Sequence, residues 1–123
     1  MQHITSKPIR TTNRNAGDYV RNGVPFTNSN GQLFGRWEAP SLYVVYSYGE
    51  HWPLFAWDNG TWYENDDRYS VTTTRHRTHA HPHTDTIPAS RTYLKTIIAN
   101  RISERSAARQ MERLQDSLMG IAA

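Results

Sequence analysis

Four histidines that lie close together are the residues with the clearest potential for chemistry: His76, His79, His81 and His83. Because the last three alternate along the chain, an extended backbone would point their imidazoles to one side. Imidazole nitrogens bind zinc, and Asp85 offers a further oxygen ligand. Against zinc, Arg75 and Arg77 place positive charge beside the loop, and Pro82 restricts its geometry. We expect no bound metal and no other cofactor, with a zinc site at these histidines as the alternative.

Other routes to catalysis find little support in the sequence. Most carboxylates stand in turn sequences, where Asp and Glu are commonplace. Glu50 and His51 form the best acid–base pair, but neighbouring residues of a strand point to opposite faces. No Gly-rich phosphate loop, nucleophile elbow or His-Glu-x-x-His motif is present, and the chain has no cysteine. We therefore predict that the protein is not an enzyme, with a zinc-dependent nuclease as the enzymatic alternative.

Basic residues that could bind an acidic partner recur near the C-terminus at every fourth position: Arg101, Arg105, Arg109 and Arg113. On a helix, which turns 100° per residue, they follow one side. Together with Arg75 and Arg77 they are the basic residues best suited to contact phosphate groups. The alternative is a solvated face with ion pairs between residues three apart, namely Arg101–Glu104, Arg109–Glu112 and Arg113–Asp116.

An aromatic-rich stretch, residues 37–69, holds all four tryptophans and ten of the fourteen aromatic residues. Exposed aromatic rings beside Lys or Arg can stack on nucleic-acid bases, and the candidates here are Tyr43, Trp57, Trp62 and Tyr63. Residues 42–63, however, contain no Lys or Arg, so a phosphate backbone would find no opposite charge there. We interpret the stretch as the core of a sheet with one partly exposed face.

The elements that must position these residues begin with an antiparallel sheet over residues 33–75. Runs rich in β-branched and aromatic residues, separated by turn residues, predict four or five strands in a meander at 33–38, 42–48, 52–57, 61–64 and 69–75. In the second run, alternation places Leu42, Val44, Tyr46 and Tyr48 on one face and Tyr43, Val45 and Ser47 on the other. Both faces are apolar, which predicts a central strand. Gly35 marks a bulge or a close backbone approach.

The sheet is flanked by less regular sequence. Residues 1–32 carry few apolar groups and predict an irregular N-terminal arm, with one short hairpin near Asn22 and Gly23. Residues 76–89 predict a loop that carries the histidines.

Residues 90–119 predict one long helix, with Ser90 as its N-cap and Gly120 at its end. Its apolar side changes along the way, from Leu94, Ile97, Ile98 and Ile102 to Ala107, Met111, Leu114 and Leu118, a turn of roughly 150°. We expect the first half to pack on the sheet and the second half to leave it and bind the arm, a symmetry mate or a partner. A break near Ser103 into two helices is the alternative.

Chain length, net charge and the lengths of the apolar runs limit the number of domains and the kinds of partner. The 123 residues suffice for one domain, here of the α+β class, with residues 1–32, 33–75, 76–89 and 90–119 as its parts. A net charge of +3 favours acidic partners such as nucleic acid only weakly. No apolar run approaches the roughly 18 residues of a membrane span, so we expect no membrane partner.

Three sequence segments carry a resemblance to a known family. Tyr43-Val-Val-Tyr-Ser-Tyr-Gly-Glu-His-Trp-Pro, Trp62-Tyr-Glu-Asn and Tyr69-Ser-Val-Thr-Thr-Thr-Arg-His together resemble a family of small uncharacterised tailed-phage proteins, over about residues 33–82. The resemblance implies a viral protein that acts in a host bacterial cytoplasm or, alternatively, in a virion. It implies no catalytic residue.

These observations predict a non-enzymatic phage accessory protein that binds a host protein or nucleoprotein, such as a CRISPR effector or the transcription machinery, or DNA or RNA. Arg105, Arg109 and Arg113 would contact the acidic partner, and Met111, Leu114 and Leu118 would supply an apolar patch that could also pair two copies. One alternative is a virion structural protein whose arm embraces a neighbouring subunit.

Overall fold

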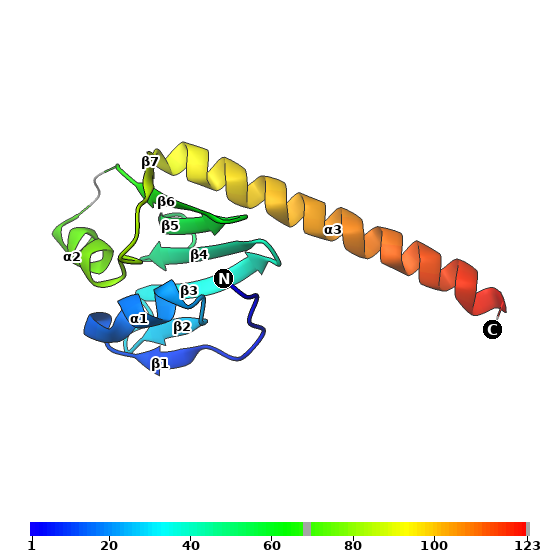
Figure 1. Cartoon of the computed structure of the whole chain (residues 1–123), viewed down its shortest axis with the longest axis horizontal. Coiled ribbons are helices and arrows are strands. Elements are labelled where there is room, and N and C mark those ends of the chain that lie inside the picture. Colours follow the sequence, from blue (N-terminus) through cyan, green and yellow to red (C-terminus); the bar gives the residue numbers. More distant parts are fainter. Residues whose placement is uncertain (68–69, 123) are drawn as a thin grey trace.

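The computed structural model describes residues 1–67 and 70–122, with side chains up to residue 120. One seven-stranded sheet forms the centre, its strands following one another in chain order (Figure 1). The strands are β1 (Ile9–Thr11), β2 (Phe26–Asn28), β3 (Leu33–Ala39), β4 (Leu42–Ser47), β5 (Pro53–Asp58), β6 (Thr61–Asn65) and β7 (Ile87–Ala89).

The sheet is mixed. Strands β2 to β6 form an antiparallel meander, whereas the outer strands β1 and β7 pair in parallel with β2 and β6. The predicted α+β class and the four strands β3 to β6 are confirmed. The prediction of a purely antiparallel sheet of four or five strands is wrong, because the arm adds β1 and β2 and the segment before the C-terminal helix adds β7.

Strand β4 is buried along its whole length and separates two apolar cores. Leu42, Val44 and Tyr46 belong to one core, while Tyr43 and Val45 belong to the other, as their alternation predicts. Tyr48 departs from this pattern. Its φ of 61° turns the chain after the strand, and its ring contacts His76 on the face of the sheet that contains Tyr43.

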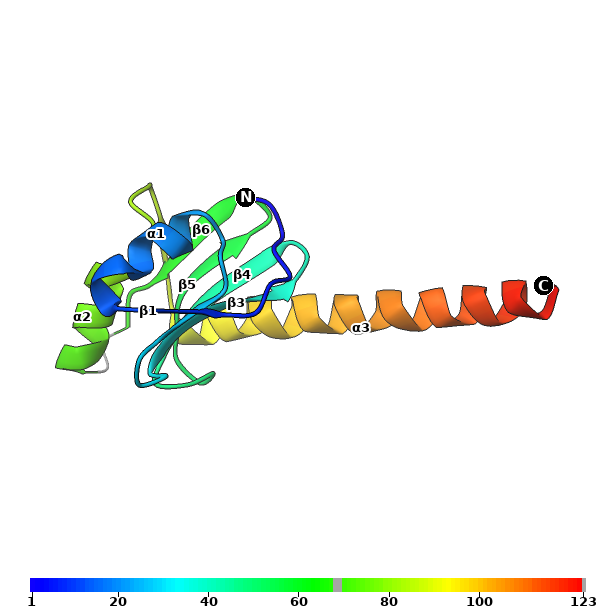
Figure 2. The ribbon, with the colours of Figure 1, turned by 90° about the horizontal axis from the view of Figure 1, so that it is seen from below.

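Helices cover both faces of the sheet. The short helices η1 (Asn13–Asn15) and α1 (Ala16–Arg21), together with α2 (Val71–His79), cover the face that contains Tyr43. Helix α3 (Arg91–Ala122) lies on the opposite face, where Leu94 and Ile97 join Leu42 and Val44. Figure 2 shows α1 and α3 on opposite sides of the sheet.

The N-terminal arm is structured, which corrects the prediction for residues 1–32. Ala16, Val20 and Phe26 are completely buried and bring α1 and β2 onto the sheet. The predicted hairpin near Asn22 is instead the end of α1, where Gly23 takes a φ of 64°. These three apolar residues are too widely spaced to reveal a strand or a helix by periodicity.

Helix α2 replaces the predicted strand over residues 69–75; residues 68–69 lie outside the described part. The Ser70 hydroxyl accepts a hydrogen bond from the Thr73 amide at 3.0 Å, and the hydroxyls of Thr74 and Thr78 bond the carbonyl groups four residues before them. This N-cap outweighs the strand preference of the β-branched residues. Seven of the residues assigned to a histidine loop therefore lie elsewhere, since 76–79 end α2 and 87–89 form β7.

Helix α3 begins where the sequence predicts, with the Ser90 hydroxyl accepting the Tyr93 amide at 3.1 Å. It is continuous through Ser103, so the alternative of two helices is wrong. It also continues through Gly120, so the prediction that the helix ends at this residue is wrong.

Gly35 provides the test of the sheet packing. A Cβ there would lie 2.6 Å from Phe26 Cε1 and closer still to the Tyr43 hydroxyl, and both rings are completely buried. Gly35→Ala should therefore lower the free energy of unfolding by about 1–3 kcal/mol, measured by urea denaturation. Gly120→Ala, where nothing lies within 4 Å, should be neutral or stabilising. Equal stability of Gly35→Ala and the wild type would contradict the packing described.

Candidate interaction surface

The first half of α3 is attached to the sheet by apolar and ionic contacts. Leu94 is completely buried, and Arg101 donates two hydrogen bonds to Asp58, at 2.9 Å to Oδ1 and 3.1 Å to Oδ2. A further ion pair joins Arg101 to Glu104 at 3.0 Å, as the alternative of a solvated face predicted for this pair. These bonds to carboxylates raise the pKa of the Arg101 guanidinium above its ordinary value. Through its bonds to Asp58 of β5, Arg101 attaches α3 to the sheet.

The attachment ends at Arg105, whose Nη1 donates to the Glu38 carbonyl at 2.6 Å. Beyond this residue, 106–120 are exposed on every side of the helix. Figure 1 shows this half of α3 extending past the edge of the sheet. The prediction that the second half of the helix leaves the sheet is therefore confirmed.

A groove of about 580 Å³ lies at the base of this projecting half. Its walls come from the N-terminal arm, from the β3–β4 turn and from α3. Ile4, Trp37 and Pro40 supply apolar surface, and Arg105 and Arg109 line it from the helix. His3 contacts the Trp37 ring with centroids 5.1 Å apart, and the Trp37 indole N–H donates to the Gly23 carbonyl at 2.7 Å, so this wall is fixed in place.

The basic and apolar stripes of α3 lie on opposite sides. Leu114 is nine residues after Arg105, a rotation of about 180° at 100° per residue. The groove is lined by Arg105, Ala108 and Arg109, so Leu114 points away from it. The single partner surface predicted from both stripes therefore divides into two faces, a groove face and an apolar face.

Arg109 and Arg113 form no ion pair with any described residue, so the pairs predicted with Glu112 and Asp116 are not formed. Arg75 is exposed on α2. Figures 1 and 2 place α2 at the end of the molecule away from the projecting half of α3. The predicted basic residues thus do not form one continuous surface.

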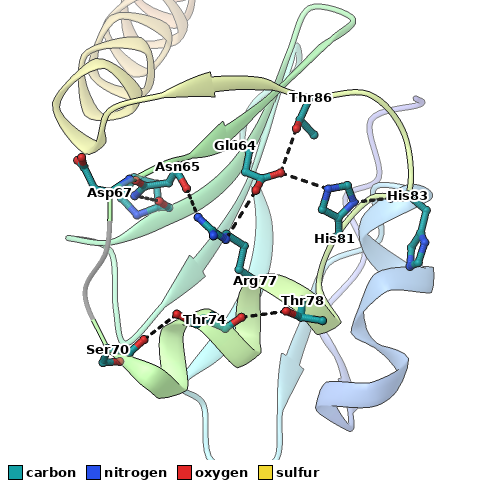
Figure 3. Close-up of polar contacts among 11 residues, drawn as sticks. Glu64, Asn65, Asp67, Ser70, Thr74, Arg77, Thr78, His81, His83 and Thr86 are labelled. Atoms are coloured by element: carbon teal, nitrogen blue, oxygen red, sulfur yellow. Dashed lines mark hydrogen bonds and ion pairs between the residues drawn. The ribbon is translucent and has the colours of Figure 1, made fainter.

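Arg77 and His81 contribute to a polar cluster around Glu64 (Figure 3). Glu64 pairs with Arg77 Nε at 3.6 Å and with His81 Nε2 at 3.2 Å, and it accepts the Thr86 hydroxyl at 3.0 Å. The His83 amide donates to His81 Nδ1 at 2.9 Å, so a neutral His81 carries its proton on Nε2, the nitrogen that faces Glu64. The cluster fastens α2 and the following loop to β6.

The predicted histidines are not gathered around a shared point. His76 Nδ1 bonds the Ser47 hydroxyl at 2.8 Å in the buried core, whereas His81 Nε2 lies 3.2 Å from a Glu64 carboxylate oxygen. Over residues 1–67 and 70–120 no group of three His, Cys, Asp or Glu side chains is placed to hold a metal ion. Ser47 is completely buried, so the Ser47–His76 pair cannot reach a substrate.

The aromatic residues considered for base stacking belong mainly to the core. Tyr43 is completely buried and its hydroxyl donates to the Val24 carbonyl at 2.8 Å, while burial raises its pKa. Trp62 is also buried. Trp37, which lines the groove, was not among the predicted site residues, and no spacing in the sequence brings Ile4 to it across more than thirty positions.

Comparison with protein-family models, curated proteins and solved structures finds no match for this chain. Within the described residues, no helix is both long and apolar enough to cross a membrane.

The buried His76 predicts a pH dependence of stability. Burial, and secondarily the neighbouring His79, lower its pKa below 6.5. Because unfolding then takes up a proton, the stability from this residue is present above about pH 6.5 and is lost as the pH falls below it, by at most about 1.4 kcal/mol per pH unit. Urea unfolding between pH 5 and pH 8 should show this slope.

His76→Gln should flatten the slope, and His83→Asn, at an exposed position, should retain it. An unchanged slope in His76→Gln would assign the dependence to another group.

Proposed function

We propose that this protein is a non-enzymatic binding protein that holds a segment of a partner protein in the groove between the N-terminal arm and α3. The observation that carries the proposal is the groove itself, where apolar surface from Ile4, Trp37 and Pro40 faces arginines of α3. Concave apolar surface with a few polar groups is the usual character of a binding site.

Polar groups in the groove favour a segment that offers oxygen acceptors. Arg109 lines the groove and forms no ion pair with any described residue. Its guanidinium could donate to an acidic side chain or a backbone carbonyl of the bound segment. Arg36, by contrast, is already paired with Glu38 and Glu50.

Charge balance favours a protein over a nucleic acid. The projecting residues 106–120 contain two arginines and two carboxylates, so their net charge is zero. Phosphate binding draws its affinity from several unpaired cations along one track. Arg101 and Arg77 are paired, and Arg75 lies at the other end of the molecule, so no such track forms among the described residues.

The resemblance of residues 33–82 to small tailed-phage proteins supports an accessory protein that acts on a macromolecule of a host bacterium, in its cytoplasm. For the alternative of a virion component with an embracing arm, residues 9–11 and 26–28 of the arm already pair in the chain's own sheet. For the alternative of a zinc nuclease, His76 and His81 face different partners, Ser47 and Glu64.

Capture from a bacterial lysate, with and without nuclease, tests the proposal. The immobilised wild-type chain should retain a protein that nuclease does not release. Arg109→Glu places a carboxylate beside an acidic segment, and Ile4→Glu places one in the apolar wall, so each should reduce capture about tenfold or more. Arg75→Glu, the same reversal on α2, should capture as the wild type does.

Capture that depends on nucleic acid, or that Arg109→Glu and Ile4→Glu leave unchanged, would refute the groove as the binding site. Unaltered tryptophan fluorescence of the variants would show that the sheet is still folded.

A further inference from the structure

The apolar face of the projecting helix is a second surface, distinct from the groove. It consists of Ala107, Met111, Leu114 and Leu118, which we call the seam. The exposed fractions of the last three side chains are 57%, 59% and 71%. Such a row of large apolar side chains in water is costly and marks a contact surface.

The fold itself leaves the seam uncovered. By the rotation of 100° per residue, the seam lies on the side of α3 away from Arg105 and the groove. The sheet and the arm are both on the Arg105 side. Covering the seam therefore requires a second molecule.

The seam spacing is that of a coiled coil. Its residues follow one another at intervals of four, three and four, which places Met111 and Leu118 at a positions and Ala107 and Leu114 at d positions of a heptad. The spacing does not extend back toward the sheet, because the preceding a position is Glu104, which is paired with Arg101. The pairing length is thus the projecting half alone.

The residues beside the seam identify the partner. The e and g positions, which face the other strand of a coiled coil, are Ala108, Gln110, Gln115 and Ser117, all uncharged. The charged residues of this half, Arg109, Glu112, Arg113 and Asp116, all occupy outer positions. When an identical helix approaches, no like charges meet across the contact, whereas nothing on this face would attract a partner of opposite charge.

We infer that the seam pairs with the seam of a second copy of this chain, forming a two-stranded coiled coil with two-fold symmetry. The two sheet domains lie on the outer sides of the pair, since each is attached to the opposite face of its helix. Arg105 and Arg109 occupy outer positions and still face the groove, with Ala108 at the border of the two surfaces, so the inference holds independently of the proposed function.

Sedimentation equilibrium of the full chain tests the pairing. The wild type should have twice the 14.2 kDa mass of one chain. Leu114→Glu places a carboxylate in the seam and should halve the mass. Arg113→Glu, the adjacent residue at an outer position, should leave the twofold mass unchanged. Because residue 114 does not touch the sheet, the tryptophan fluorescence of Leu114→Glu should match the wild type.

A wild-type mass of one chain at every concentration would overturn the inference, as would a Leu114→Glu variant that remains a dimer. The same variants separate the two proposals, because Arg109→Glu should lose the groove partner and still sediment as a dimer, whereas Leu114→Glu should be a monomer that still captures the partner.

Discussion

Burial of β4 on both of its faces is the constraint on which the rest of the structure depends. A strand with no exposed residue requires neighbours on each side and a covering layer above and below. β3 and β5 supply the neighbours, α1 and α2 cover the Tyr43 face, and α3 covers the Val44 face. The arm is ordered for the same reason, since Phe26 fills the space that Gly35 leaves open over Tyr43.

The sheet needs only part of α3, and this difference in length produces the candidate binding surfaces. At 1.5 Å per residue, the helix spans about 48 Å, whereas the attached residues 91–105 span about 22 Å. The remainder is held by its continuity with the attached half, which provides the helical nucleus. Where the helix leaves the sheet, its groove face and the arm line the groove, and the seam on its opposite face is exposed.

The features of this protein that depend on local pattern are predictable from its sequence. Alternation identified β4 as a central strand, Ser90 marked the start of α3, and the change of apolar side predicted where that helix would leave the sheet. Elements whose structure is decided by contacts between distant residues are not predictable in this way. The threonine-rich segment that forms α2 has a strand composition, and the isolated Val20 and Phe26 carry no period, so only the packed sheet reveals their roles. The groove joins Ile4 to Arg109, a juxtaposition that no spacing encodes.

Residue-resolved amide hydrogen exchange along α3 tests the division of this helix at Arg105 most directly. In dilute protein, amides of residues 94–105 should exchange slowly because they are packed on the sheet, and those of 106–120 should exchange quickly. Raising the protein concentration should slow exchange in 106–120 alone. Equal protection of the two halves in dilute protein would contradict the account, because it would show that the second half packs on its own chain.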